Sequence, residues 1–147
     1  MRIYNTLSEK KEELKKPLFR KLKLFVCGPT VYDTPHIGNA RTFLAFDMIV
    51  RYLRSRGFKI FYLQNITNID DKIIKRAADE SVSWEVISQR YEAAFKQNVA
   101  ALDITSVDAY ARSTEFIQEI IKQIETLITK GHVYKITEDG WYFDLTT

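Results

Sequence analysis

A histidine, a glycine and an asparagine at the start of an expected helix are the residues best suited to chemistry. His36 and Asn39 are three positions apart, so on a helix they share one face. A helix N-terminus attracts phosphate, because its free N–H groups and the helix dipole favour negative charge. Gly38 lets a ligand approach the backbone closely. The pattern indicates a phosphate site, and a histidine that simply begins the helix explains so short a motif equally well.

The elements that must position these residues form a strand–loop–helix–strand series. Residues 23–27 predict a short apolar strand, a helix is expected over 38–56, and residues 58–66 predict a second strand. Apolar faces are expected on this helix and on a later one that follows Ser83, and their residues are Phe43, Phe46, Val50 and Leu53 on the first and Trp84, Ile87, Tyr91 and Phe95 on the second. Such a βαβ series implies a parallel sheet, whose ligands bind at the carboxyl ends of the strands. We therefore expect residues 27–39 and 65–71 to lie side by side.

The rest of the chain predicts three more helices and a hairpin. One helix follows Asp70 through residue 78, Ser83 is expected to cap the next, and Ser113 or Thr114 to cap a long third one. Two short strands, at 132–135 and 141–145, flank an Asp-Gly turn typical of a hairpin. Gly57 and Gly131 are expected just after the ends of helices.

Composition and charge exclude several classes of protein. The chain has 147 residues, of which 46% are hydrophobic and 28% charged, so it has the size and balance of one globular domain. No apolar run is long enough for a membrane span, and no signal peptide is recognisable, so the cytoplasm is the expected compartment. The net charge of +3 does not by itself indicate a nucleic-acid binder. Residues 10–23 are strongly basic and are expected to form a solvated loop.

Alternatives stay open for several polar residues. Cys27, the one cysteine, cannot form an intrachain disulfide, and at a strand end it is expected to be a small buried hydrophobe. Asp70 and Asp71 suit a helix cap better than a metal site, because adjacent helix residues point apart. Lys72 can lie near a phosphate or near Asp70. Thr67 ends the second strand and can bond its own loop. The remaining candidates are expected to be structural or to lie in the core or an interface: His132, Trp84 and Trp141.

Three motifs in order give the chain a resemblance to a known family. They are FVCGPTVYD at 25–33, HIGNAR at 36–41 and NITNIDDKI at 65–73. With the opening YNTL and the later KGHVY, this chain resembles cysteinyl-tRNA synthetases, which are class I aminoacyl-tRNA synthetases. The resemblance implies an α/β Rossmann-like nucleotide-binding fold. Residues 1–110 would be the first half of that catalytic domain, and 111–147 the start of an inserted α+β segment.

The resemblance also implies a reaction and its site residues. ATP, with magnesium, would activate cysteine as cysteinyl adenylate, and the cysteinyl group would pass to tRNA(Cys). His36 and Asn39 would be catalytic, and Thr30 and Gly38 would join them in binding ATP. The family signature is His-Ile-Gly-His, so Asn39 keeps a hydrogen-bond donor but cannot be protonated. Gly28 and Thr67 would bind cysteine.

Cys27 would, by the same resemblance, be one of four zinc ligands, and the zinc would bind the substrate thiolate. Zinc prefers sulfur to a serine hydroxyl, which would separate cysteine from serine better than pocket size does. The other three ligands, a Lys-Met-Ser-Lys-Ser loop and an anticodon-reading domain belong to parts of the family's sequence that this chain does not contain. The full-length enzyme is expected to be a monomer without membrane contact.

Two other functions are compatible with the sequence. One is the related ligase that joins cysteine to an amino sugar in mycothiol synthesis, in which His-Leu-Gly-His is typical. The other is a non-catalytic nucleotide-binding fragment, because half of the active site is missing. This chain has His-Ile-Gly-Asn in place of that signature, together with the Tyr32-Asp33 and Asp70-Asp71-Lys72 runs that resemble the synthetases.

Overall fold

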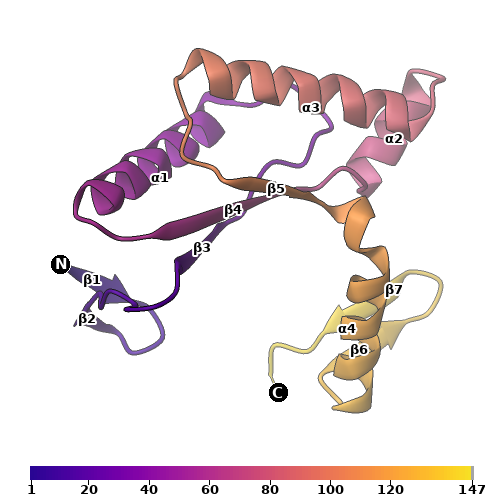
Figure 1. Ribbon diagram of the computed structural model, residues 1–147. Helices are drawn as coiled ribbons and strands as arrows, with labels where there is room; N and C mark the ends of the chain where they lie inside the picture. The colour runs from indigo at the N-terminus through magenta and orange to yellow at the C-terminus, as the bar shows by residue number, and fades with distance from the viewer. Residues whose placement is uncertain (147) are drawn as a thin grey trace.

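The computed structural model describes residues 1–146 and is built on a parallel sheet of three strands in the order β3-β4-β5 (Figure 1). The strands are β3 (Leu22–Val26), β4 (Ile60–Ile66) and β5 (Ala109–Arg112). Both neighbouring pairs are parallel, with Val26 opposite Gln64. The predicted α/β class with a parallel sheet is confirmed.

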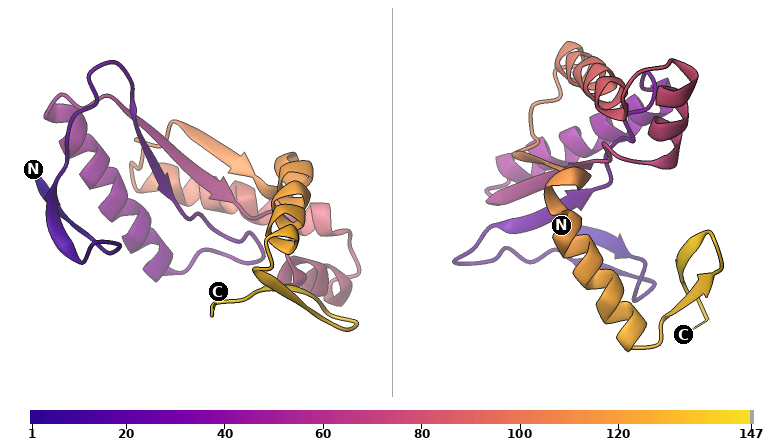
Figure 2. Two further views of the ribbon diagram at one scale, coloured as in Figure 1. Left: turned by 90° about the horizontal axis from the view of Figure 1, so that it is seen from below. Right: turned by 90° about the vertical axis from the view of Figure 1, so that its right-hand side faces the viewer.

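Three helices cover one side of this sheet. Helix α1 (Ile37–Ser55) connects β3 to β4, and α2 (Asp71–Asp79) and α3 (Trp84–Ala101) lead from β4 to β5. Figure 1 shows α1 and α3 above the sheet, and the side view in Figure 2 agrees. The apolar faces predicted for α1 and α3 are turned into the core, where these residues are buried: Phe43, Val50, Leu53, Ile87, Tyr91 and Phe95. Burying these side chains supplies most of the driving force that holds the helices on the sheet.

A buried carboxylate fastens α1 to the segment that leads into β5. Asp47 is 2% exposed, and its Oδ1 accepts hydrogen bonds from the backbone N–H of Thr105 at 3.0 Å and of Ser106 at 2.8 Å. Its Oδ2 pairs with Nε of Arg51 at 2.5 Å. Burial alone would raise the pKa of Asp47, but the hydrogen bonds from Ser106 and Arg51 outweigh burial and lower it.

Two smaller units flank the sheet domain. An antiparallel hairpin, β1 (Arg2–Asn5) with β2 (Lys10–Glu13), precedes it. After β5 the chain forms a 3₁₀ turn (Ser113–Phe116), and α4 (Ile117–Thr129) follows. A second hairpin comes last, and Figure 2 shows that it and α4 project from the sheet domain. Its strands are β6 (Val133–Ile136) and β7 (Gly140–Phe143).

The proposed division of the chain at residue 110 stays a prediction. Strand β5 continues the sheet to Arg112, two residues beyond that boundary. The predicted insertion segment ends at Thr147, which lies outside the described residues. The expected hairpin inside it is confirmed, and the left-handed residue of its turn is Glu138 (φ 65°).

Several expected elements differ from those observed. Part of the basic segment is not a loop, because Lys10–Glu13 is strand β2. Ser113 and Thr114 do not cap α4, since they form the 3₁₀ turn before it. The Thr114 hydroxyl instead accepts a hydrogen bond from Asn68 at 2.7 Å, which ties this turn to the end of β4. Strand β5 was not predicted, because its four residues are too few to show a period.

Most helix ends follow the sequence signals. The Asp70 carboxylate accepts the backbone N–H of Lys72 at 2.9 Å, so the capping interpretation is confirmed. Gly57 (φ +78°) and Gly131 (φ +74°) follow α1 and α4 in the left-handed conformation that ends helices. Ser83 holds the N-cap position of α3, but its side chain makes no capping hydrogen bond.

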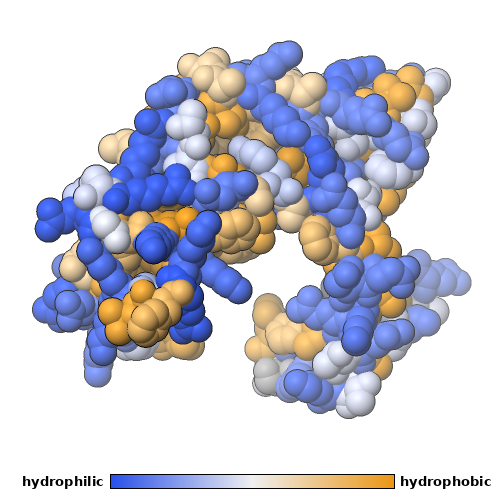
Figure 3. Space-filling model, viewed as in Figure 1, coloured by the Kyte–Doolittle hydropathy of each residue, from blue (hydrophilic) through white to orange (hydrophobic). Residues whose placement is uncertain are grey.

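Hydrophobic side chains are exposed on the C-terminal unit, which consists of α4 and the β6–β7 hairpin. No residue of α4 is buried, and Trp141 is 49% exposed, whereas Trp84 packs against the core. Figure 3 shows hydrophobic atoms at the surface of this unit, between hydrophilic stretches. Within residues 1–146, no helix has both the length and the apolar character needed to cross a membrane.

Candidate active site

The carboxyl ends of β3 and β4 meet through a backbone ladder that continues beyond both strands. Thr30 and Thr67 form a parallel bridge. The N–H of Thr67 donates to the Pro29 carbonyl at 2.9 Å, and the N–H of Val31 donates to the Thr67 carbonyl at 3.1 Å. The expectation that the two loops lie side by side is therefore confirmed. These hydrogen bonds fix the position of Thr30 relative to the end of β4.

Gly28 is required by a close approach between the two strand ends. Its N–H donates to Oδ1 of Asn65 at 2.7 Å. A Cβ atom at this position would lie 1.8 Å from the Asn65 carbonyl oxygen, so no other residue fits without moving the backbone. Asn65 also donates from Nδ2 to the Thr67 hydroxyl at 3.2 Å. Asn65 of the Asn-Ile-Thr motif thus bonds both the loop after β3, at Gly28, and the loop after β4, at Thr67.

His36 begins α1 and caps it with its own ring. It holds the N-cap position in an extended conformation, and its Nδ1 accepts the N–H of Gly38 at 3.1 Å. The Asn39 N–H donates to the His36 carbonyl at 2.9 Å, which closes the first turn. A neutral imidazole that accepts at Nδ1 carries its proton on Nε2. The exposed ring therefore offers an Nε2–H donor next to the N–H groups of the helix start.

Two adjoining cavities collect the predicted site residues. A cavity of about 260 Å³ is lined by Cys27, Gly28, Thr30 and Asn39, among others. A smaller one, of about 80 Å³, has Thr30, His36 and Asn39 in its wall. The two cavities share Thr30 and Asn39, so the predicted ATP-binding and cysteine-binding residues are neighbours.

Two predicted site residues lie just outside these walls. In the described part of the chain, Gly38 and Thr67 line neither cavity. Gly38 supplies the capped N–H of α1, and Thr67 supplies the backbone bridge to Thr30. The roles of Gly38 in binding ATP and of Thr67 in binding cysteine stay predictions.

Cys27 is exposed, which contradicts the expectation of a buried core cysteine. It comes one residue after β3 ends, so its side chain leaves the packed face and opens onto the 260 Å³ cavity. Its Sγ lies 3.8 Å from the Gly28 carbonyl oxygen. Within residues 1–146, no group of three or more His, Cys, Asp or Glu side chains is placed to hold a metal. Cys27 could therefore supply only one ligand of a metal site, and the other ligands would have to come from residues outside this group.

Lys72 and Tyr32 line the larger cavity and were not predicted as site residues. The Lys72 Nζ lies 5.2 Å from the centre of the Tyr32 ring, within range of a cation–π interaction. This places the ammonium beside the cavity, and a contact between Lys72 and a phosphate stays a prediction. No local pattern predicts this contact, because it joins the start of α2 to a loop 40 positions earlier in the chain.

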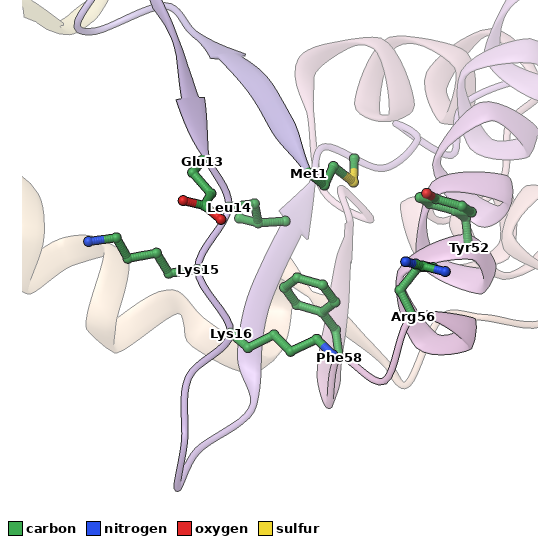
Figure 4. Close-up of a pocket in the computed structure, with 8 residues that line it drawn as sticks. All are labelled: Met1, Glu13, Leu14, Lys15, Lys16, Tyr52, Arg56 and Phe58. Carbon is green, nitrogen blue, oxygen red and sulfur yellow. The ribbon is translucent and has the colours of Figure 1, made fainter.

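A third cavity is lined by Arg56, which caps the C-terminal end of α1, whereas His36 caps the other end (Figure 4). It has a volume of about 430 Å³ and lies between the N-terminal hairpin and the last turns of α1. Its cationic residues are Lys15, Lys16 and Arg56, and the Lys16 Nζ lies 5.2 Å from the centre of the Phe58 ring. None of the predicted site residues lines it.

Comparison with known proteins assigns the chain to a family. Residues 14–147 match the family described as tRNA synthetases class I (C) catalytic domain. The chain belongs to this family. The cysteine–tRNA ligases of Thermoplasma acidophilum and Pyrococcus abyssi are each 46% identical to it, over 146 and 145 residues. These alignments cover 99% of this synthetase chain but 32% and 30% of the two relatives, so it spans about a third of their length.

Solved structures agree with the synthetase fold. Mycobacterium tuberculosis methionyl-tRNA synthetase in complex with methionyl-adenylate superposes with a TM-score of 0.67 and 24% identity. The match covers 78% of this synthetase chain and 23% of the methionyl enzyme. The expected Rossmann-like catalytic fold of class I synthetases is confirmed.

Proposed function

We propose that this chain forms the first part of the catalytic domain of a ligase that charges tRNA(Cys) with cysteine. The observation that carries the proposal is the meeting of Cys27, Thr30, His36 and Asn39 around two adjoining cavities at the strand ends. The identity to cysteine–tRNA ligases supports the choice of amino acid and acceptor. Because the chain spans about a third of those relatives, activity is expected from a ligase of the relatives' length that carries this segment, called the assembled ligase below.

ATP would bind at the start of α1 in the assembled ligase. The Nε2–H of His36 and the side-chain amide of Asn39 would face the phosphates at the positive end of the helix dipole, with magnesium bound to the nucleotide. Thr30 lies in the wall of both cavities, where its hydroxyl can bond the nucleotide or the amino acid. Asn39 cannot take a proton, so its contribution is to donate hydrogen bonds and to orient the phosphates.

The first chemical step is adenylate formation. A carboxylate oxygen of cysteine forms a bond to the α-phosphorus, the bond from this phosphorus to the bridging oxygen breaks, and pyrophosphate leaves with the electron pair. A hydroxyl of the terminal ribose of tRNA(Cys) then attacks the cysteinyl carbonyl, loses its proton, and AMP departs. Both steps depend on positioning and on donors aimed at developing negative charge, which His36 and Asn39 can supply.

Cysteine would occupy the cavity beside Cys27, Gly28 and Thr30. The exposed thiol of Cys27 fits a role as one zinc ligand, because thiolate is a preferred zinc donor and the side chain opens onto this cavity. Zinc, when bound, would supply a soft cation that favours a thiolate over a hydroxyl. Thr67 would shape the same pocket by holding Thr30 in place. The ligase would act as a cytoplasmic monomer on cysteine, ATP and tRNA(Cys).

Cysteine-dependent exchange of pyrophosphate into ATP tests the function in the assembled ligase. We expect exchange with cysteine and at least a hundredfold less with serine, followed by transfer of cysteine to tRNA(Cys). Transfer to an amino sugar in place of tRNA would indicate the mycothiol-type ligase. No exchange at saturating cysteine would indicate a non-catalytic nucleotide-binding protein and would contradict the proposal.

A further inference from the structure

A guanidinium on α2 joins the loop before His36 to the helical layer. Nη1 of Arg76 donates to the Tyr32 carbonyl oxygen at 3.1 Å and lies 3.0 Å from Oδ2 of Asp33. Nε of the same side chain pairs with Oε1 of Glu80 at 2.9 Å. The planar guanidinium therefore binds Tyr32 and Asp33 through Nη1, while its Nε is held by Glu80 at the end of α2.

The helical side of this contact is itself held by α3. Oε2 of Glu80 accepts from Nη1 of Arg90 at 2.6 Å, so Glu80 is shared between the two arginines. These hydrogen bonds, the one from Arg76 first, lower the pKa of Glu80, so it stays ionised at neutral pH. The Arg76 guanidinium also lies 4.6 Å from the centre of the Tyr91 ring. Tyr91 is buried and lines the smaller cavity together with His36.

The loop side of the contact leads directly to His36. Oδ1 of Asp33 accepts the N–H of Thr34 at 2.7 Å, so the carboxylate held by Arg76 also shapes the turn that follows. Pro35 comes next and has a fixed φ, which transmits the direction of the turn to the helix start. Only Thr34 and Pro35 separate Asp33 from His36, so few rotatable backbone bonds lie between the Arg76 contact and the capping ring.

We infer that Arg76 is a positioning residue for adenylate formation, acting through Tyr32 and Asp33 to hold His36 at the phosphate site. The inference rests on the proposed function. Arg76 lines neither of the two active-site cavities, so its effect is on the placement of the loop. Arg76 contacts none of the cysteine-side residues Cys27, Gly28 and Thr30, and it holds Tyr32, which lines the cysteine cavity, by the backbone carbonyl oxygen. The rate of adenylate formation should therefore fall while the cysteine requirement does not.

The test compares four variants of the assembled ligase. Arg76→Gln removes the charge and the fork, and Arg76→Lys keeps the charge but not the several fixed donors. Arg90→Gln also breaks a bond to Glu80 but leaves the loop contacts intact, so it reports the cost of loosening α2 from α3. Lys75→Gln is the matched control, because Lys75 is the exposed neighbour of Arg76 on the same helix.

Cysteine-dependent pyrophosphate exchange and amide hydrogen exchange over residues 32–36 are measured on each folded variant. We expect Arg76→Gln to lower kcat about tenfold to a hundredfold, with KM for cysteine within about twofold, since small misplacements have effects of this size. Arg76→Lys should recover part of the rate. The loop amides should exchange faster in Arg76→Gln than in Arg90→Gln, and Lys75→Gln should match the unaltered ligase.

Equal rates in the Arg76 and Arg90 variants, or unchanged loop exchange in Arg76→Gln, would overturn the inference. So would a fall in activity that only follows the unfolded fraction measured in the same sample. An unaltered ligase without any cysteine-dependent exchange would instead overturn the proposed function, and with it the catalytic part of this inference. The variants therefore test the inference about Arg76, and the unaltered ligase tests the proposed function.

Discussion

At the scale of single residues, the two ring nitrogens of His36 have separate tasks. Nδ1 accepts the N–H of Gly38 and so completes the helix start, while Nε2 carries the proton that can reach a phosphate. A substitution such as alanine at this position removes both the helix cap and the donor. The two effects can be separated, because asparagine is also a good helix cap.

The first prediction compares His36→Ala with His36→Asn in the assembled ligase. Both remove the ring donor, so we expect maximal pyrophosphate exchange to fall about a hundredfold in each, with the cysteine requirement within about twofold. Alanine alone loses the cap, which should cost about 1 kcal/mol of stability measured by denaturant unfolding. A raised cysteine requirement at an unchanged maximal rate would contradict the assigned role.

Cys27→Ser provides a second prediction, and the exposure of Cys27 makes it sharper. Because the thiol is exposed, serine leaves no buried unsatisfied hydroxyl, and stability should change by less than about 0.5 kcal/mol. Zinc content and cysteine activation of the assembled ligase should fall together, because a hydroxyl is a poor zinc ligand. ATP binding should change little. Full zinc with normal exchange in the serine variant would end the ligand hypothesis.

At the scale of elements, the contact between Gly28 and Asn65 joins the two strand ends that build the site. A third prediction is that Gly28→Ala is severely destabilising, by about 3 kcal/mol or more, because a methyl group cannot fit beside the Asn65 carbonyl. Gly140→Ala is the control, since its Cβ meets no atom within 4 Å and its φ is not in the left-handed region. Denaturant unfolding of both variants gives the difference. A cost for Gly28→Ala no larger than that of Gly140→Ala would show that the strand ends do not pack this closely.

Asp47 holds α1 against the segment before β5, and it allows a prediction about pH. Its pKa is lowered in the folded state, so its contribution to stability is present above the ordinary aspartate pKa and is lost as the pH falls through the folded-state value. Asp47→Asn should lower the free energy of unfolding by about 2–3 kcal/mol at pH 7, because four donors, from Arg51, Thr105 and Ser106, lose an anionic partner.

The difference between Asp47→Asn and the unaltered protein should shrink on acidification below about pH 4. Urea unfolding at several pH values measures this. Asp103→Asn serves as the comparison, because Asp103 contacts the same arginine from a side chain that is 83% exposed. A difference that grows at low pH would contradict the assignment.

At the scale of the whole molecule, the strand ends hold one thiol, and within residues 1–146 no group of three or more His, Cys, Asp or Glu side chains is placed to hold a metal. A zinc site needs three or four protein ligands. The fifth prediction is that the 147-residue chain alone retains no stoichiometric zinc after dialysis against a weak chelator, whereas the assembled ligase does. Elemental analysis of both preparations decides, and one zinc per isolated chain would refute the shared-ligand arrangement.

The sequence by itself determined the βαβ series, the apolar faces of α1 and α3 and the pairing of the two polar loops. These follow from local periods and from turn residues such as Gly28 and Gly57, which act over a few positions. Strand β5, the Asn68–Thr114 bond and the Arg76–Asp33 pair were decided by tertiary structure, since they join segments more than 40 residues apart. Periodicity carries no information on which distant groups meet. The exposure of Cys27 was decided in the same way, because one strand end looks like any other until its sheet and cavity exist.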